Sequence, residues 1–273
     1  MKTICLSLLF YLFLQPNAFS ELRLSLNKSQ YQTLKKRFPQ PFSKRFDLYI
    51  EAFNGKNFLL EKNKVKFRIK NSKKKSVIQV SKEVEEKSLK CGPHKVSWKK
   101  RIVYESKSKD LVRLLLFKGY EIFKYINSHD ILPLNLALDF DFQIRALNFK
   151  GKELLFQTLN KKEPYILVPS HTNKKYRKKR TLKLGKGKRL HIVLGKTLEK
   201  GKNGLFITTY EMEGEGDPLN SEKKKHYLKS FCRYLKKIAP SNQDASEEIG
   251  EKDINLELYI NKMPSFIFKK KKN

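Results

Sequence analysis

Apolar and charged residues alternate strictly along several segments of the chain, and this alternation limits the fold to one rich in β-strands. In residues 64–70 (KVKFRIK), apolar side chains hold the odd positions and cations hold the even ones. Residues 21–26 (ELRLSL) and 189–194 (RLHIVL) begin in the same way. A period of two places successive side chains on opposite faces of a strand. The pattern therefore predicts many strands, each with one apolar and one polar face.

Three other segments carry apolar residues at helical spacing behind a residue suited to cap a helix. The capping residues are Asn27, Ser108 and Ser221, whose side chains can accept hydrogen bonds from the first turn. The apolar stripes that follow are Tyr31, Leu34 and Phe38; Leu111, Leu115, Ile122 and Ile126; and Leu228, Phe231, Leu235 and Ile238. Helices that interrupt a mostly antiparallel series of strands predict an α+β fold.

The charged faces of the strands allow two arrangements. Residues 64–70 place four cations in a row, and Glu211, Glu213 and Glu215 place three carboxylates in a row. Same-face neighbours lie roughly 6–7 Å apart along a strand, so such cations repel one another unless water or an anion screens them. In an open sheet the charged face meets water. We favour the other arrangement, a closed, tunnel-like and mostly antiparallel β-barrel with a charged lumen and a few flanking helices.

The first twenty residues have the pattern of a secretory signal peptide. Lys2 precedes an apolar run from Ile4 to Leu14, and the small-residue site Ala18-Phe19-Ser20 follows. The run is too short to span a bilayer, and no later stretch approaches the roughly 20 apolar residues that a membrane helix needs. We therefore expect a chain without a transmembrane helix that is exported to the periplasm or secreted, with a mature part that begins at Glu21.

The mature part divides into one domain and a tail. Residues 21–239 hold the strands and helices described above, and residues 240–273 hold a polar linker, a last strand-like run and the basic tail Lys269–Lys272. The tail can contact an anionic membrane surface weakly or remain solvated. An oxidising compartment permits a disulfide between Cys91 and Cys232, but their distance in sequence leaves this pairing open.

A formal net charge of +33, from 60 basic and 27 acidic residues, predicts an anionic partner. The cationic rows alternate with aliphatic rather than aromatic residues, which makes nucleic acid a less expected partner than a phosphate chain. The sequence contains no H-E-x-x-H, G-x-S-x-G or P-loop motif. Its glutamate row is the candidate site for a hard cation such as Mg²⁺ or Mn²⁺, or else a solvent-facing acidic strand that pairs with lysines.

The order of short motifs resembles the CYTH, or triphosphate tunnel metalloenzyme, superfamily across roughly residues 21–238. Glu21-Leu22-Arg23-Leu24-Ser25 stands where that family has E-x-E-x-K. The later motifs correspond to residues 47–51, Lys66–Lys70, Val80–Lys82, Arg101–Glu105, Arg177–Arg180 and Glu211–Glu213, the last followed by a helix. The resemblance implies a tunnel-like barrel that binds triphosphate or polyphosphate.

The resemblance also implies roles for individual residues, although it assigns no catalytic residue. It places phosphate-binding cations at Lys66, Arg68, Lys70, Lys82, Arg101, Arg177 and Arg180. It places Mg²⁺ or Mn²⁺ ligands at Glu21, Glu211 and Glu213. A bound metal would polarise a phosphoryl group for attack by water.

Three positions depart from the family pattern. Arg23 and Ser25 replace the second glutamate and the lysine of the opening motif, and Gly195 stands where an aspartate is often found. Arg23 would place a cation among the expected metal ligands. Two functions therefore stay open: a metal-dependent phosphohydrolase, and a non-enzymatic polyanion-binding or envelope protein that retains the basic barrel.

Overall fold

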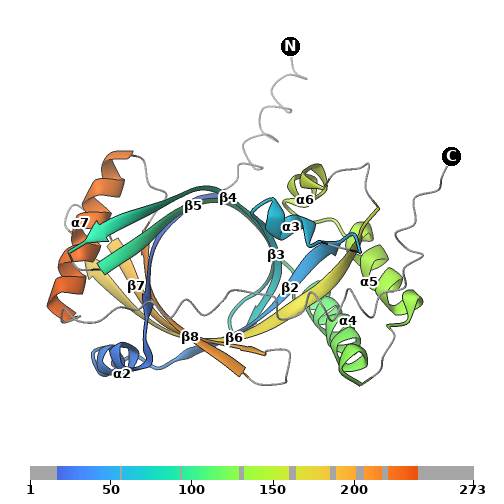
Figure 1. Ribbon diagram of the computed structural model, residues 1–273, viewed down its shortest axis with the longest axis horizontal. Coiled ribbons are helices and arrows are strands. Elements are labelled where there is room, and N and C mark those ends of the chain that lie inside the picture. Colours follow the sequence, from blue (N-terminus) through green and yellow to red (C-terminus); the bar gives the residue numbers. More distant parts are fainter. Residues whose placement is uncertain are drawn as a thin grey trace, which may run out of the picture.

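The computed structural model describes residues 17–55, 57–92, 94–128, 132–159, 164–184, 189–200, 206–216 and 221–238. Its eight strands form a closed barrel in the order β1-β5-β4-β3-β2-β6-β7-β8, and all neighbours are antiparallel (Figure 1). The strands are β1 (Asn17–Leu26), β2 (Ser43–Phe53), β3 (Val65–Ser72), β4 (Ser76–Cys91), β5 (His94–Lys107), β6 (Ile166–Lys183), β7 (Arg189–Lys200) and β8 (Phe206–Gly216). The predicted α+β barrel is confirmed.

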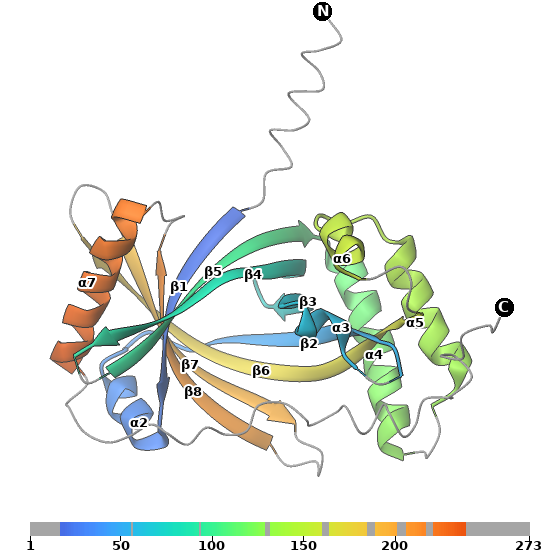
Figure 2. The ribbon, with the colours of Figure 1, turned by 45° about the horizontal axis from the view of Figure 1, so that its top comes forward.

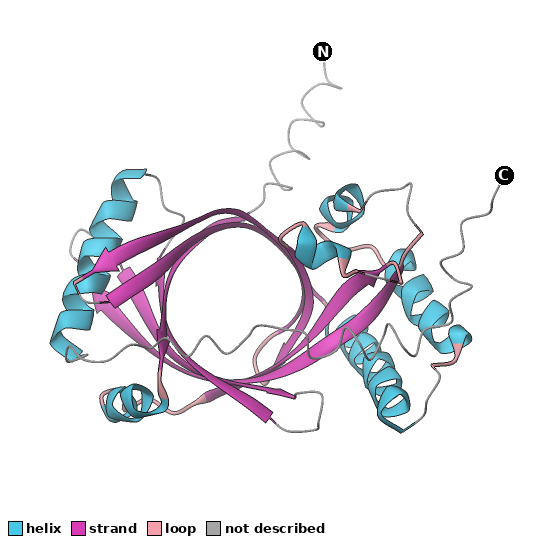
Figure 3. Ribbon diagram, viewed as in Figure 1, coloured by secondary structure: helices cyan, strands magenta, loops and turns pink. Residues whose placement is uncertain are grey.

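The helices of the described chain lie outside the barrel, in two groups on opposite sides (Figures 1, 2 and 3). Their bounds are α2 (Lys28–Lys36), α3 (Leu59–Lys62), α4 (Lys109–Ser128), α5 (Leu134–Ala146), α6 (Lys152–Thr158) and α7 (Ser221–Ile238). Helices α3 to α6 gather beside β2, β3 and the far part of β6, while α2 and α7 lie beside β1, β7 and β8. No helix in the described part of the chain has the length and apolar character to cross a membrane.

The apolar face of each alternating strand packs outward against these helices. Phe67 and Ile69 of β3 are fully buried in one cluster with Val112 of α4 and Phe140 of α5. A second cluster joins apolar residues of β1, β7 and β8 to α2 and α7. Because the two faces of a strand alternate, the charged residues between these apolar ones lie inside the barrel. We call this interior the lumen.

Two of the predicted caps are formed by hydrogen bonds. The Gln30 amide donates to Asn27 Oδ1 over 2.8 Å, and the Asn27 amide donates to Gln30 Oε1 over 3.0 Å, which makes a capping box at the start of α2. The Leu111 amide donates to Ser108 Oγ over 3.3 Å at the start of α4. Ser221 is the first residue of α7.

A disulfide joins Cys91 at the end of β4 to Cys232 of α7, with Cα atoms 5.1 Å apart. It ties the tip of the β4–β5 hairpin to the helix that covers β1, β7 and β8.

Near the start of the chain, β1 begins at Asn17. The expected cleavage after Ser20 therefore falls within this strand, and Ser20 is only 5% exposed. The predicted linker, last strand and tail (240–273) lie outside the described residues.

Candidate functional site

The structure brings most of the residues predicted to bind phosphate or metal together in the lumen. The residues on the inward face come from five strands of the barrel, β1, β3, β5, β6 and β8, and are Lys66, Arg68, Lys70, Arg101, Arg177, Glu21, Glu211 and Glu213. In β1, β3 and β8 these residues have the parity opposite to the buried apolar residues of the same strand, and Arg101 and Arg177 join them through ion pairs with Glu21 and Glu213. Closure of the sheet therefore places cations and carboxylates that are distant in sequence on facing walls.

Lys82 and Arg180 lie on the outer face and do not join this group. Lys82 shares the parity of the buried Val80 and is exposed. Arg180 is exposed beside α7, where its charge opposes the rise in the pKa of the Tyr234 phenol that burial causes. Because strand faces alternate, each of these cations points away from the lumen. The structure thus removes both from the set of residues that share the lumen.

Arg23 of β1 stands at the centre of the predicted carboxylate cluster. Its guanidinium pairs with Glu21, lies 3.1 Å from Glu213 Oε1 and lies 3.6 Å from Glu211 Oε2. Burial alone would lower the pKa of Arg23, but Glu21, Glu213 and Glu211 outweigh it and hold this pKa well above its usual value. The predicted cluster exists, and it is built around a fixed positive charge.

A second arginine engages the same cluster from the opposite side. Arg177 of β6 pairs with Glu213 Oε2 and donates to Glu215 Oε1 over 2.6 Å. Glu213 is only 5% exposed. Its burial would raise its pKa, but Arg177 and Arg23 outweigh burial and lower it. Glu213 is therefore ionised and has an arginine on each of its two oxygens.

This arrangement does not fit a resident divalent metal ion. Among the described residues, no group of three or more His, Cys, Asp or Glu side chains is arranged to hold one. The carboxylates proposed as ligands, Glu21, Glu211 and Glu213, are all directed at Arg23. We therefore assign no metal-dependent step to this cluster.

The opposite wall of the lumen, on β2 and β3, carries a second group of charges. Asp47 is fully buried and accepts a hydrogen bond from Arg45 Nη2 over 3.0 Å, and Arg68 Nη1 lies 3.6 Å from it. Arg68 also donates to the Tyr49 hydroxyl over 3.2 Å. Burial would raise the pKa of Tyr49, but Lys175 and Arg68 outweigh it and lower this pKa to about 8.

The two walls interact electrostatically. Tyr49 lies on β2, the strand opposite β1 in the closed order, and it contributes to the raised pKa of Arg23. In turn, the charge of Arg23 opposes the rise in the pKa of Arg68. These effects act across the interior and not along one strand, in agreement with the closed strand order that brings the charged rows together.

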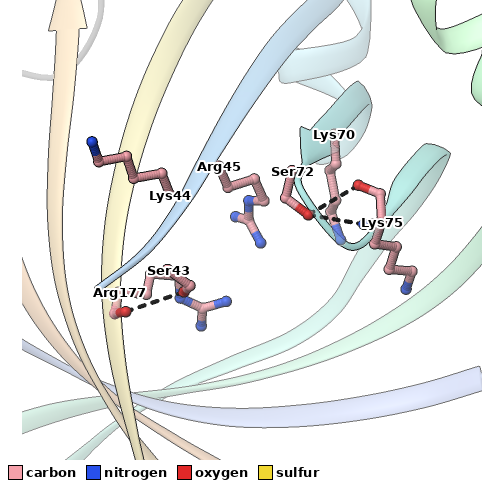
Figure 4. Close-up of a pocket in the computed structure, with 7 residues that line it drawn as sticks. All are labelled: Ser43, Lys44, Arg45, Lys70, Ser72, Lys75 and Arg177. Carbon is pink, nitrogen blue, oxygen red and sulfur yellow. Dashed lines mark hydrogen bonds between the residues drawn. The ribbon is translucent and has the colours of Figure 1, made fainter. Parts of the chain in front are cut away.

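A pocket of about 230 Å³ opens at the end of the lumen where β2 begins and β3 ends. It is lined by Ser43, Lys44, Arg45, Lys70, Ser72, Lys75 and Arg177. Figure 4 shows Arg45 and Arg177 extending into it from β2 and β6, with Lys70 and Lys75 on the other side, while Lys44 points away. None of the described residues that line it is a carboxylate or an aromatic. We call Arg45, Lys70, Lys75 and Arg177 the mouth cations.

Glu105, behind the pocket, holds two of the mouth cations in place. It accepts a hydrogen bond from Lys70 Nζ over 2.9 Å, pairs with Lys75 and accepts from Gln79 Nε2 over 2.6 Å. Burial lowers the pKa of Lys70 to about 7, with help from Arg68, and outweighs the attraction of Glu105. Lys70 therefore titrates near neutral pH, and an added anion would favour its charged form.

Sequence reasoning missed three cations of this site: Arg45, Lys75 and Lys175. Arg45 has the parity of Asp47 and Tyr49, and Lys175 has the parity of Arg177, so the period of two places both inside once the strands are recognised. Lys75 lies in the β3–β4 turn, where no periodic pattern applies. Its position depends on the pairing of the two strands.

Comparison with known proteins gives structural matches only. No family model matches the chain, and no curated protein matches it. The structure is similar to a proposed adenylate cyclase from Bacillus halodurans (16% identity, 84% of this chain and 94% of that one, TM-score 0.49). It is also similar to a proposed adenylyl cyclase from Hippeastrum with a dominant triphosphatase activity (16%, 85% and 92%, TM-score 0.41).

A third match is the RNA triphosphatase of S. pombe (13% identity, 87% of this chain and 89% of that one, TM-score 0.36). Each of these three TM-scores is below 0.5.

Proposed function

We propose that this protein binds a phosphate chain, a triphosphate or a polyphosphate, at the pocket and in the adjoining lumen. The observation that carries the proposal is the convergence of the four mouth cations on one cavity of about 230 Å³ with no carboxylate among its described lining residues. Four basic side chains at one opening favour a compact anion of high charge over a monovalent one.

The chemistry of the mouth cations suits phosphate oxygens. Arginine presents a planar fork of donors that matches phosphate, and lysine adds a point charge with three donors. The absence of an aromatic among the described lining residues gives a nucleobase no stacking surface. The phosphate portion of a ligand is therefore the part that this pocket recognises.

On binding, the chain's own residues supply charge and position. Arg45 and Arg177 are held by Asp47 and by Glu213 and Glu215, so their guanidinium groups are oriented before the anion arrives. Lys70 takes up a proton near neutral pH because the anion stabilises its ammonium form. We assign the protein as a binder and not as a hydrolase, because Arg23 and Arg177 already engage the carboxylates that would hold Mg²⁺ or Mn²⁺.

We also propose that the protein works after export. The signal-peptide pattern of residues 1–20 supports this, and so does the Cys91–Cys232 disulfide, a bond that persists in oxidising compartments. The test is N-terminal sequencing of the protein recovered from expressing cells. A mature chain that begins at Glu21 is the expected result, and an intact N-terminus at Met1 would contradict export by this route.

The proposal of phosphate-chain binding is tested by titrating the purified protein with tripolyphosphate in an isothermal calorimeter. Lys75→Ala removes a mouth cation, and Lys74→Ala removes the same charge from an exposed position in the same turn that does not line the pocket. A hydrogen bond to a charged group contributes roughly 1.5–3 kcal/mol, so Lys75→Ala should bind about tenfold more weakly, or worse. Lys74→Ala should bind within about twofold of wild type.

Two outcomes would contradict this proposal. Equal losses in the two variants would indicate a general charge effect and no pocket, and no binding by wild type would remove the function altogether. Phosphate release is followed in the same samples with Mg²⁺ and with Mn²⁺. Metal-dependent release would replace the binding protein with a phosphohydrolase.

A further inference from the structure

We infer that Arg23 is the permanent counter-cation of the lumenal carboxylates, so that this barrel binds its phosphate anion without a divalent metal ion. The inference rests on the proposed function, because it states how that site is balanced electrically. It concerns the wall around β1 and β8, which lies opposite to β2 and β3 with Asp47 and Arg68, and which Arg177 reaches from β6.

The register of the strands places Arg23 among the carboxylates. Arg23 of β1 is in register with Glu213 of β8, and its neighbours Glu21 and Ser25 are in register with Glu215 and Glu211. Four carboxylates thus lie on one patch of the wall with Arg23 inside it. Their mutual repulsion requires a cation, and the guanidinium fills that place with contacts to three of them.

The oxygens themselves are occupied by arginine donors. Glu213 has Arg23 on Oε1 and Arg177 on Oε2. Glu21 Oε1 is shared by Arg23 and by Arg101, whose Nη1 lies 3.2 Å away. A divalent cation would have to displace these donors and remain beside a guanidinium that does not deprotonate in proteins.

The arginines also explain why this wall does not repel the anion. Arg23 and Arg101 contact Glu21, Glu211 and Glu213, and Arg177 joins Glu213 and Glu215 to the mouth, so three arginines offset most of the charge of these four carboxylates. The anion then meets the excess positive charge at the mouth. In a barrel where metal ions neutralise the carboxylates, their neutralisation would depend on the supply of metal, whereas here arginine side chains of the protein itself provide the positive charge.

Removing the charge of Arg23 should release a metal site that the wild-type protein lacks. In Arg23→Gln, Glu211 loses its arginine contact, Glu21 keeps only Arg101, and Glu213 keeps only Arg177. Clustered carboxylate oxygens are the ligands that Mg²⁺ and Mn²⁺ prefer. The variant should therefore gain affinity for a divalent ion.

The experiment titrates Mn²⁺ alone into the chelator-treated protein and measures free Mn²⁺ by electron paramagnetic resonance. Wild type should bind no stoichiometric Mn²⁺, and Arg23→Gln should bind one ion per chain at least tenfold more tightly than wild type. Arg180→Gln makes the same charge change on the outer face and should gain nothing. Arg23→Lys keeps the cation and should also gain nothing. If Arg23→Gln fails to fold, stoichiometric Mn²⁺ binding by wild type or by Arg23→Lys would still overturn the inference.

Stoichiometric Mn²⁺ binding by wild type would overturn the inference, and so would a folded Arg23→Gln variant that binds no more Mn²⁺ than wild type. A tripolyphosphate titration in EDTA separates the two proposals. Binding that requires Mn²⁺ would overturn the role of Arg23 and leave the proposed function in place. Binding in neither condition would overturn the proposed function, while the Mn²⁺ titration would still decide the role of Arg23.

Discussion

Arg177 of β6 donates a hydrogen bond to Glu215 of β8 over 2.6 Å, although β7 lies between these two strands. The β7 residue in register with Arg177 is Gly195, which is also in register with Glu211. A Cβ atom at this position would lie 3.1 Å from Glu211 Cγ. The missing side chain of Gly195 therefore leaves room for Glu211 and for the arginine that reaches across β7.

Filling this space should disturb both the stability and the site. Gly195→Val places a branched side chain against Glu211 and in the path of Arg177, and overpacking of this kind destabilises by about 1–3 kcal/mol. We expect that loss in urea denaturation, together with weaker binding of tripolyphosphate. Gly195→Ala should show a smaller loss. A Gly195→Val protein as stable as wild type, with unchanged affinity, would show that Arg177 does not need this space.

Glu213 should be the most sensitive carboxylate of the lumen. Glu213→Gln leaves Arg23 and Arg177 facing one another without the charge between them, and breaking a buried ion pair costs about 3–5 kcal/mol. Denaturation in urea measures this loss. Glu153→Gln, an exposed position on α6, should change stability by less than about 0.5 kcal/mol. Similar values for the two variants would mean that Glu213 is not the link between the arginines.

The pH dependence of the same variant gives an independent reading. The pKa of Glu213 is lowered in the folded protein, so its contribution to stability is complete above the unfolded value of about 4.3 and is lost as the pH falls below it. Wild type should therefore lose more stability than Glu213→Gln on acidification from neutral pH through that value. Parallel stability curves for the two proteins would contradict a lowered pKa at this position.

Sequence periodicity predicted the barrel well because each strand carries its own evidence. In residues 64–70 the alternation alone places Lys66, Arg68 and Lys70 on one face, and the structure has all three in the lumen. The carboxylate row of β8 was predicted in the same way. Closure of the sheet was inferred from the charges, because a row of cations on one strand face repels unless water or an anion screens it, and a closed sheet brings such rows together around an anion.

Two residues that the motif order grouped with the phosphate-binding cations lie on the outer face, because the motif was given more weight than the period of two. Lys82 shares the parity of the buried Val80, so the alternation itself placed it outside, and Arg180 is one residue out of phase with Arg177 and Lys179. A shift of one residue moves a strand side chain to the opposite face. The pairing of Cys91 with Cys232 could not be predicted, because one sequence holds no information on the distance between residues 141 positions apart.

Lys70 should make phosphate-chain binding depend on pH near neutrality. Its pKa of about 7 means that it is charged below this pH and neutral above it, so affinity for tripolyphosphate should fall as the pH rises through 7. Lys70→Arg keeps its positive charge both below and above pH 7, because arginine does not deprotonate in proteins. Its affinity should show only the dependence that arises from protonation of the anion, which both proteins share. Identical pH profiles for the two proteins, by calorimetry, would show that Lys70 does not titrate in this range.

The disulfide should stabilise the fold without taking part in binding. Strand β4 begins next to Lys75 at the pocket and ends at Cys91, so the bond to Cys232 lies at the opposite end of this strand from the mouth cations. Removing a native disulfide costs about 2–5 kcal/mol. We expect Cys91→Ser/Cys232→Ser to show this loss in urea denaturation and to bind tripolyphosphate within about twofold of wild type. Reduced wild type should match the variant, and a reductant that leaves its unfolding midpoint unchanged would show that the bond contributes nothing to stability.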